Sequence, residues 1–166
     1  MTFAELENVY DEYFAKIYNH LYYRVLSKDL SDDLTSDVFL KVVKNLDGFD
    51  ETKASFKTWI YTIANNTLID YYRRRKNEAG FLEESDEPVC HFDEQSGIFK
   101  SEELRLLHDA LSTLDERTRE VVSLKYNAEM SIRDIAKLIG INESTASTLH
   151  TRGLAKLRKI LAKDFF

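Results

Sequence analysis

Residues Ser55–Lys76, SFKTWIYTIANNTLIDYYRRRK, predict one long helix with two different faces. Apolar side chains recur on one face at the spacing of a helix packed on a core: Phe56, Ile60, Ile63, Ala64, Leu68 and Tyr71. The second stripe is polar and aromatic and holds Trp59, Thr62, Asn66, Asp70 and Arg73. Aromatic rings stack on bases, amides read base edges and guanidinium groups neutralise phosphate, so this stripe favours contact with DNA or RNA.

The same helix ends in a compact basic cluster, Arg73–Lys76. Cations at a helix C-terminus also interact favourably with the helix dipole, so end-capping alone explains part of this cluster. A solvated surface is therefore the alternative interpretation. The cluster and the polar stripe together favour nucleic-acid binding over that alternative.

The composition predicts an all-α protein. The 166 residues include one proline and five glycines, against abundant helix-forming side chains. The single cysteine, Cys90, excludes an internal disulfide and suits a reducing compartment. No apolar run is long enough to span a bilayer, and the N-terminus lacks a signal-peptide pattern. We therefore expect a cytoplasmic protein with no direct membrane insertion.

Charge is distributed unevenly along the chain. The net charge is −6, yet residues 51–76 carry 6 basic and 2 acidic groups, and residues 104–166 carry 11 and 8. Between them, residues 77–103 carry 1 basic and 9 acidic groups. Because phosphate neutralisation drives most non-specific affinity for DNA, the overall acidity predicts weak binding by the free protein. The protein is expected to meet DNA with the help of a partner.

Periodicity predicts three helices in the first half of the chain. Thr2 and Glu5 form a capping box for the first helix, and the second begins at about Ser31. Together with the helix over residues 55–76, these elements can bury one another's apolar faces. The first half is therefore expected to form a helical bundle.

The predicted architecture is two small helical domains joined by a flexible acidic linker. The bundle spans residues 1–76. Periodicity is lost over residues 77–100, which hold the only proline and most of the acidic excess, and this segment is the linker. Residues 101–166 form the second domain.

The second domain contains the pattern of a helix-turn-helix. Ser131 is placed to cap the helix Ile132–Ile139, Gly140 to end it, and Asn142 to cap the next helix. Small and apolar residues fill the positions where two such helices cross: Ile135, Ala136, Ile139, Ile141, Ala146 and Leu149. A plain helical hairpin shares this glycine and spacing but does not require every position, so DNA binding is favoured. Candidate base and phosphate contacts are Asn142, Glu143, Ser144, Ser147, Thr148, Thr151, Arg152 and Lys156.

Nothing in the sequence assembles a catalytic or metal site. Cys90 and His91 are adjacent, but a structural zinc site needs four ligands and there is no second cysteine. The acidic residues around Asp33 suit a helix start better than a hydrolase centre. No nucleophile, base and oxyanion hole can be combined, so we expect neither enzyme activity, metal nor cofactor.

Two stretches carry a family resemblance. DLTSDVFLKVVKNLDGFD (residues 33–50), followed by SFKTWIYTIANNTLIDYYRRR, resembles region two of the extracytoplasmic-function (ECF) sigma factors of bacterial RNA polymerase. LSTLDERTREVVSLKYNAEMSIRDIAKLIGINESTASTLHTRGLAKLRK resembles region four of the same family. Both regions in this order, with a short linker and no region three, cover nearly the whole chain. A helix-turn-helix regulator that works without polymerase is the alternative.

The resemblance implies partners and residue roles. Region two would dock on the β′ clamp helices of core RNA polymerase through Asp33, Asp37, Phe39, Leu40, Lys41 and Lys44. It would recognise and melt the minus-ten promoter element with Asn66 near a flipped-out base, the loop Phe49–Ser55 walling its pocket, and Trp59, Asn65, Tyr72, Arg73 and Arg74 as neighbours. Region four would read the minus-thirty-five element of promoter DNA and contact the β flap. An anti-sigma factor, often membrane-bound in this family, would hold the protein inactive.

One departure from the family concerns the second DNA-reading helix. Its centre is usually rich in Arg and Lys, whereas here Ser147, Thr148 and Thr151 occupy that stretch and Arg152 is the first basic residue. Phosphate anchoring at this helix is therefore expected to be weaker, and its promoter preference to be its own.

Overall fold

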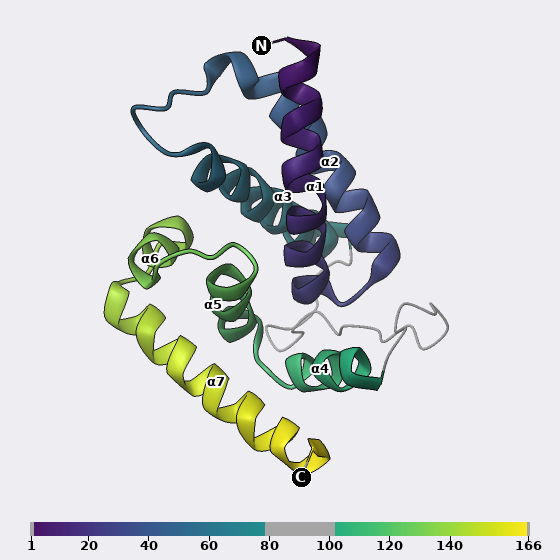
Figure 1. Ribbon diagram of the computed structural model, residues 1–166, viewed down its shortest axis with the longest axis vertical. Helices are drawn as coiled ribbons and strands as arrows, with labels where there is room; N and C mark the ends of the chain where they lie inside the picture. Colours follow the sequence, from purple (N-terminus) through teal and green to yellow (C-terminus); the bar gives the residue numbers. More distant parts are fainter. Residues whose placement is uncertain (1, 79–101, 166) are drawn as a thin grey trace. The chain divides into compact units, whose positions relative to one another are not determined.

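Every described element is helical, as the composition predicts. The structure is a computed structural model that describes residues 2–78 and 102–165. Within these residues lie seven α-helices, one 3-10 helix and no strand (Figure 1). The helices are α1 (Phe3–Val25), α2 (Lys28–Asn45), the 3-10 helix η1 (Leu46–Gly48), α3 (Phe56–Glu78), α4 (Glu102–Ser112), α5 (Glu116–Tyr126), α6 (Ile132–Ile139) and α7 (Glu143–Phe165).

The chain divides into two compact units. The first comprises Met1–Leu21 and Asp29–Val89, and the second comprises Tyr22–Lys28 and Cys90–Phe166. The last turn of α1 is thus grouped with the second half, which the sequence did not predict. The domain limits 1–76 and 101–166 remain a prediction, and most of the predicted linker lies outside the described residues.

Aromatic contacts join the three long helices of the first unit. The rings of Tyr10 in α1 and Phe39 in α2 are 5.1 Å apart, and those of Tyr13 in α1 and Phe56 in α3 are 5.3 Å apart. The fully buried side chains complete this core: Ile17, His20, Leu21, Ser31, Thr35, Val38, Val42, Ile60, Tyr61, Ala64, Thr67 and Leu68. The predicted bundle is therefore present, with α3 packed through the face that its periodicity indicates.

Helix ends follow their capping residues. Glu5 N–H donates to Thr2 Oγ1 at 3.3 Å and Thr2 N–H donates to Glu5 Oε2 at 2.6 Å, which completes the predicted capping box. Helix α2 begins at Lys28, three residues before the predicted start at Ser31. Helix α3 continues to Glu78, two residues beyond its predicted end at Lys76. These two residues had been assigned to the linker.

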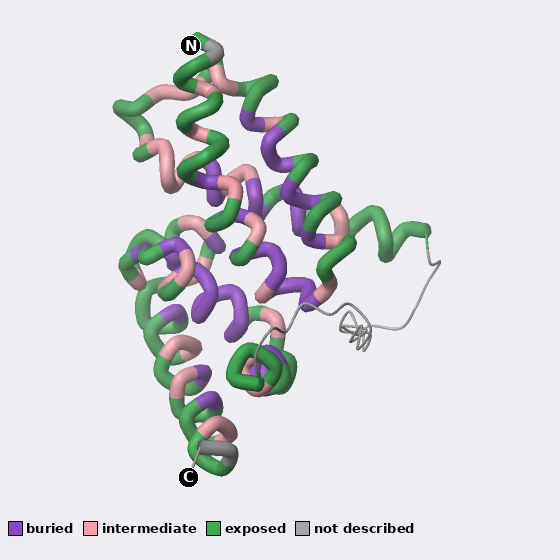
Figure 2. Tube along the Cα trace, turned by 45° about the vertical axis from the view of Figure 1, so that its right-hand side comes forward, coloured by how far each residue is buried: buried purple, intermediate pink, exposed green. Residues whose placement is uncertain are grey.

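The second unit is built on α7. Buried and exposed positions alternate along this helix (Figure 2), and its Leu157 packs in a cluster with Ala110, Leu111, Leu114 and Val122. The backbone of α7 approaches α5 closely at Gly153, where an added Cβ would lie 2.8 Å from Thr118 Cγ2. This close approach requires glycine at the centre of a long helix, where glycine otherwise costs about 0.5–1 kcal/mol relative to alanine.

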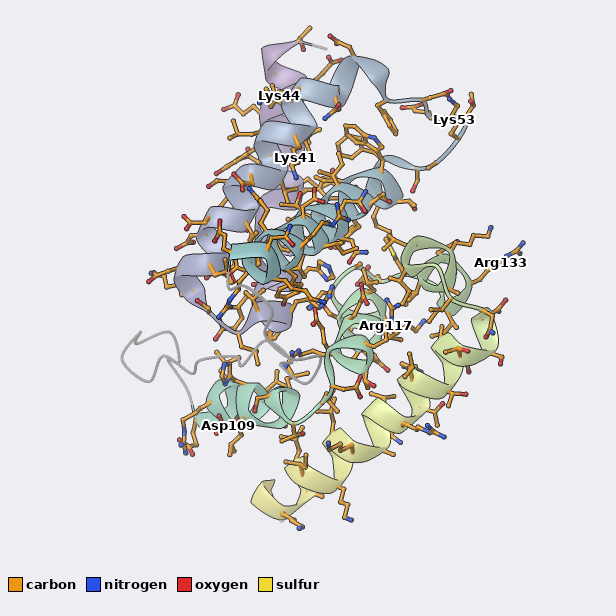
Figure 3. The ribbon with its side chains drawn as sticks, turned by 180° about the vertical axis from the view of Figure 1, so that it is seen from behind. Lys41, Lys44, Lys53, Asp109, Arg117 and Arg133 are labelled. Atoms are coloured by element: carbon orange, nitrogen blue, oxygen red, sulfur yellow. The ribbon has the colours of Figure 1, made fainter. Side chains whose placement is uncertain are left out.

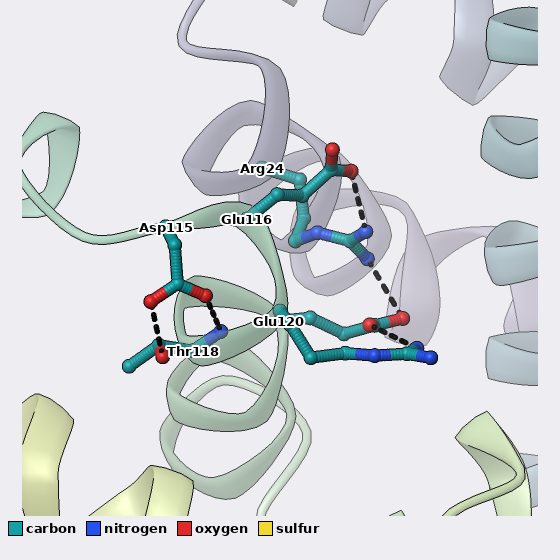
Figure 4. A network of polar contacts seen from close by, with 6 residues as sticks. Arg24, Asp115, Glu116, Thr118 and Glu120 are labelled. Carbon is teal, nitrogen blue, oxygen red and sulfur yellow. Dashed lines mark hydrogen bonds and ion pairs between the residues drawn. The ribbon is translucent and has the colours of Figure 1, made fainter. Parts of the chain in front are cut away.

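A buried ion-pair network lies at the start of α5 (Figure 4). Asp115 caps the helix by accepting from the Thr118 N–H at 2.9 Å. Arg24, which belongs to the second unit, donates to Glu116 at 3.0 Å and to Glu120 at 3.3 Å. A buried guanidinium needs such carboxylate partners, because an unpaired buried charge costs several kcal/mol.

Candidate nucleic-acid and polymerase interface

The loop before α3 is a hydrogen-bonded turn. Asp50 accepts from both the N–H of Thr52 at 2.9 Å and its hydroxyl at 2.6 Å. These bonds from Thr52 favour the charged carboxylate and lower the pKa of Asp50. Ser55 then caps α3 by accepting from the Thr58 N–H at 3.2 Å. The loop thus has a fixed path into the helix.

An aromatic cluster joins this loop to the first turn of α3. The Trp59 ring lies 5.0 Å from the ring of Phe49 and 5.4 Å from that of Phe56. All three side chains are half-buried, so each presents part of its ring to solvent. Packed aromatic rings with exposed surface provide a preformed platform on which an unpaired base can stack.

The two adjacent asparagines of α3 differ in exposure. Asn66 is exposed on the polar stripe, two helical turns beyond Trp59. Asn65 is only 4% exposed and lies in the core of the first unit. Successive residues of a helix point about 100° apart, which separates the two side chains. Of the two predicted contacts, therefore, only Asn66 is available at the surface, and Asn65 contributes to packing.

The C-terminal part of α3 presents the predicted basic residues. Arg73 and Arg74 are both exposed, and Arg73 Nη1 lies 3.6 Å from Asp70 Oδ1. Tyr72 is half-buried, with its ring 5.6 Å from that of Tyr71. The polar stripe therefore runs from an aromatic end at Trp59 to a cationic end at Arg73 and Arg74.

Two exposed apolar residues mark the outer face of α2. Leu40 is 59% exposed and Val43 is 51% exposed, one helical turn apart. Leu40 was among the residues predicted from the sequence and Val43 was not, although both lie off the apolar stripe that packs α2. Asp33 and Asp37 are exposed on the same helix. Adjacent apolar side chains in solvent, bordered by charges, are typical of a protein-binding surface.

Two predicted polymerase contacts on α2 point elsewhere. Phe39 is 8% exposed and packs against Tyr10 and Phe14, so it is a core residue. Lys41 is turned toward α3, where its ammonium donates to Thr67 Oγ1 at 3.1 Å. Lys44 is exposed. Of the predicted polymerase contacts on α2, Asp33, Asp37, Leu40 and Lys44 are exposed, and Val43 lies beside them.

The helix-turn-helix follows its sequence pattern closely. Ser131 accepts from the Asp134 N–H at 3.1 Å, and Asn142 Oδ1 accepts from the Thr145 N–H at 2.7 Å, so both predicted caps are present. Gly140 ends α6 with a φ of 72°, in the left-handed region that favours glycine. Ala136 and Ala146 are buried where α6 and α7 cross.

Most predicted minus-thirty-five residues share one exposed face of α7. Those exposed are Asn142, Glu143, Ser144, Ser147, Thr148, Thr151 and Arg152. Lys156 is exposed as well, and its ammonium donates to the Thr113 carbonyl at 2.5 Å, which ties α7 to the end of α4. Two exposed cations on α6, Arg133 and Lys137, were not predicted from the sequence, and Arg133 projects away from its helix (Figure 3). The sequence pattern that could have predicted them is the spacing of four residues, which places both cations on one face of the first helix of the helix-turn-helix.

Tyr126 and His150 form a pair beside this face. The Tyr126 hydroxyl lies 3.0 Å from His150 Nε2, and the two rings stack with centroids 5.7 Å apart. Burial, and then the charge of Lys125, lower the pKa of His150 below its usual 6.5. The hydrogen bond between the Tyr126 hydroxyl and the His150 ring links the end of α5 to α7.

His150→Gln is expected to alter the pH dependence of stability. Because the folded state disfavours imidazolium, this histidine's contribution is complete above pH 6.5 and is lost as pH falls toward the lowered pKa. The variant should therefore lose less stability than the parent on acidification below about pH 6.5. Thermal unfolding of both proteins between about pH 5 and 8 measures this. Parallel curves would contradict the assignment.

The described residues contain no cluster of three or more His, Cys, Asp or Glu side chains placed to hold a metal ion. Cys90 and His91 lie outside these residues. None of the helices in residues 2–78 and 102–165 combines the length and apolar character that a membrane span requires.

Comparison with known families matches the two halves separately. The family model Sigma-70 region 2 matches residues 9–78, and the model Sigma-70, region 4 matches residues 104–157. The chain is 31% identical to RNA polymerase sigma factor YlaC of Bacillus subtilis, over 96% of this chain and 93% of YlaC. It is 30% identical to ECF RNA polymerase sigma factor SigX of the same organism, over 91% of this chain and 80% of SigX.

These matches define a class of transcription initiation proteins, the sigma factors. The chain belongs to the ECF sigma factors of RNA polymerase, as the resemblance implied. It is also 29% identical to ECF RNA polymerase sigma factor BldN of Streptomyces coelicolor over 94% of this chain, where it spans only 60% of BldN.

Solved structures agree on the fold. The sigma factor RpoE of Bartonella quintana, solved in complex with the anti-sigma factor NepR, matches with a TM-score of 0.74 at 21% identity, over 95% of this chain and 97% of RpoE. CnrH, solved with the cytosolic domain of CnrY, matches with a TM-score of 0.68 at 22% identity, over 96% of this chain and 88% of CnrH.

Proposed function

We propose that this sigma factor directs core RNA polymerase to promoters with two spaced elements and melts the minus-ten element by capturing an unpaired base. The observation that carries this proposal is the polar stripe of α3, where exposed Asn66 follows the half-buried aromatic platform of Trp59. The protein opens the minus-ten element by binding alone, because stacking and hydrogen bonds can offset the few kcal/mol that base extrusion costs.

In region two, the surface around Leu40 and Val43 docks on the β′ clamp helices. Its apolar centre supplies the buried contact, and the exposed carboxylates of Asp33 and Asp37 supply charge at the rim. Lys44 stands at the edge of this surface. The loop Phe49–Ser55 walls the pocket that receives the flipped base, and Arg73 and Arg74 neutralise the strand's phosphates.

In region four, the exposed face of α7 enters the major groove of the minus-thirty-five element. Its hydroxyl groups hydrogen-bond base edges and phosphates, while Arg133 and Lys137 of α6 contact the backbone. Cations on α6 would offset the lack of basic residues at the centre of α7. The second unit would also meet the β flap of polymerase.

An anti-sigma factor is the expected regulator. The structural neighbours RpoE and CnrH were solved with the proteins NepR and CnrY, of which NepR is named an anti-sigma factor. By analogy, a cognate anti-sigma factor would cover the polymerase-docking surface of α2 until a signal releases it. The chain itself would act in the cytoplasm, where its polymerase and promoter DNA are found.

Genomic run-off transcription tests this function. Bacterial core polymerase is combined with the full chain, and transcripts are compared with those from core polymerase alone. New transcripts that share two spaced upstream motifs are expected. Absence of such transcripts, with tight sequence-specific DNA binding by the protein alone, would instead indicate a regulator that works without polymerase.

A further inference from the structure

A groove of about 520 Å³ lies between α2 and α3 in the first unit. It brings together residues that the sequence assigned to two different partners, polymerase and the minus-ten strand. Its lining residues are Asp37, Leu40, Lys41 and Lys44 from α2 and Asp70, Arg73 and Arg74 from α3. Lys41 and Lys44 project from the same side of α2, one turn apart (Figure 3).

Asp70 is shared between two of the four cations in this groove. Its Oδ2 lies 3.7 Å from Lys41 Nζ, and its Oδ1 lies 3.6 Å from Arg73 Nη1. Lys44 and Arg74 have no acidic partner in the described part of the chain. The groove therefore combines four cations with two carboxylates, Asp37 and Asp70, an excess of two positive charges, and the single charge of Asp70 is shared between Lys41 and Arg73.

These ion pairs are of the kind that exchange easily. The Asp70 side chain is 47% exposed and both distances exceed 3.5 Å, so water screens the pairs and each contributes little to stability. Ammonium and guanidinium groups form charge-assisted hydrogen bonds to phosphate oxygens as they do to carboxylates, at about 2.7–2.9 Å, which is shorter than either contact of Asp70. A phosphodiester can therefore take the place of Asp70 as partner of Lys41 and Arg73.

We propose that this groove binds a backbone phosphate of single-stranded promoter DNA, and that Asp70 lowers the groove's affinity for DNA in the free protein by pairing with Lys41 and Arg73. The inference rests on the proposed contact between α3 and the minus-ten strand. Its consequence is specificity. With one of the four positive charges cancelled by Asp70, the free protein gains less from any DNA strand it meets, and productive binding requires the base contacts as well.

Asp70→Asn tests the proposal because it removes the charge and keeps the shape. Binding of fluorescent oligo(dT) to the full free chain is measured by anisotropy over a series of salt concentrations. The variant should bind about 3–10-fold tighter at low salt, and the slope of log K against log salt should steepen by about 0.7 for each released cation. Adding Lys44→Ala and Arg74→Ala to this variant should remove the gain.

Asp11→Asn is the matched control, since Asp11 is an exposed carboxylate on α1 and the change in net charge is the same. An equal increase in oligo(dT) affinity in both variants would mean that net charge alone causes the effect, and this would overturn the proposal. An unchanged affinity in Asp70→Asn would overturn it as well. Lys44→Ala with Arg74→Ala in the parent chain gives a second check, because unchanged oligo(dT) affinity would also overturn it. Run-off transcription by the parent protein tests the proposed function independently of these results.

Discussion

Asn66→Ala is expected to reduce promoter opening by roughly 10–100-fold while leaving polymerase binding unchanged. An amide that reads a base contributes about 1–3 kcal/mol, and this contact is made only once the base is unpaired. The Asn66 side chain is exposed, so its removal leaves the core of the first unit intact. Permanganate reactivity of the minus-ten thymines measures opening, and native gel electrophoresis with core polymerase measures assembly.

Asn19→Ala provides the control for this variant. Asn19 is an exposed asparagine of α1, so the chemical change is the same at a position away from the polar stripe. It should open promoters as the parent does. Unchanged permanganate reactivity in Asn66→Ala would remove this residue from the melting step, and lost polymerase binding would instead indicate a structural role.

The fold was predictable where a local signal fixed each helix. Capping residues such as Thr2, Ser131 and Asn142 each satisfy backbone groups that a helix end leaves unpaired, so their positions can be read directly from sequence. The start of α2 was misjudged although Ser27, a residue type favoured at helix N-caps, stands directly before Lys28. The contacts of Arg24 with Glu120 could not be predicted, because a pairing between residues 96 positions apart has no periodic signature.

The sequence predicted which faces of the helices are exposed, but it predicted the exposure of individual residues less well. Helical periodicity separates the core face of α3 from its polar face, but Asn65 and Asn66 stand next to each other and only packing decides which is exposed. Lys41 illustrates the same limit on α2. Its long side chain can reach solvent or the neighbouring helix, and here it reaches Thr67. The groove itself requires two helices in contact, which neither helix alone reveals.

Gly153→Val is expected to destabilise the second unit by about 1–3 kcal/mol or more, the usual cost of overpacking a core. A Cβ at this position would lie 2.8 Å from Thr118 Cγ2 and 3.0 Å from Val122 Cγ2, and valine adds two further methyl groups. Since a small domain has only a few kcal/mol of net stability, much of the population would lose the packing of α7 on α5. Chemical denaturation of the full chain measures the loss.

Two substitutions control for this effect. Ala155→Val places the same side chain at an exposed position of α7, and Gly48→Ala adds a Cβ where no atom lies within 4 Å. Both should unfold close to the parent. Because the docking surface of α2 belongs to the first unit, Gly153→Val should still bind core polymerase but lose transcription that depends on the minus-thirty-five element. Parent-like unfolding of Gly153→Val would mean that α5 and α7 do not approach this closely, and the face of α7 assigned to DNA would then need to be redrawn.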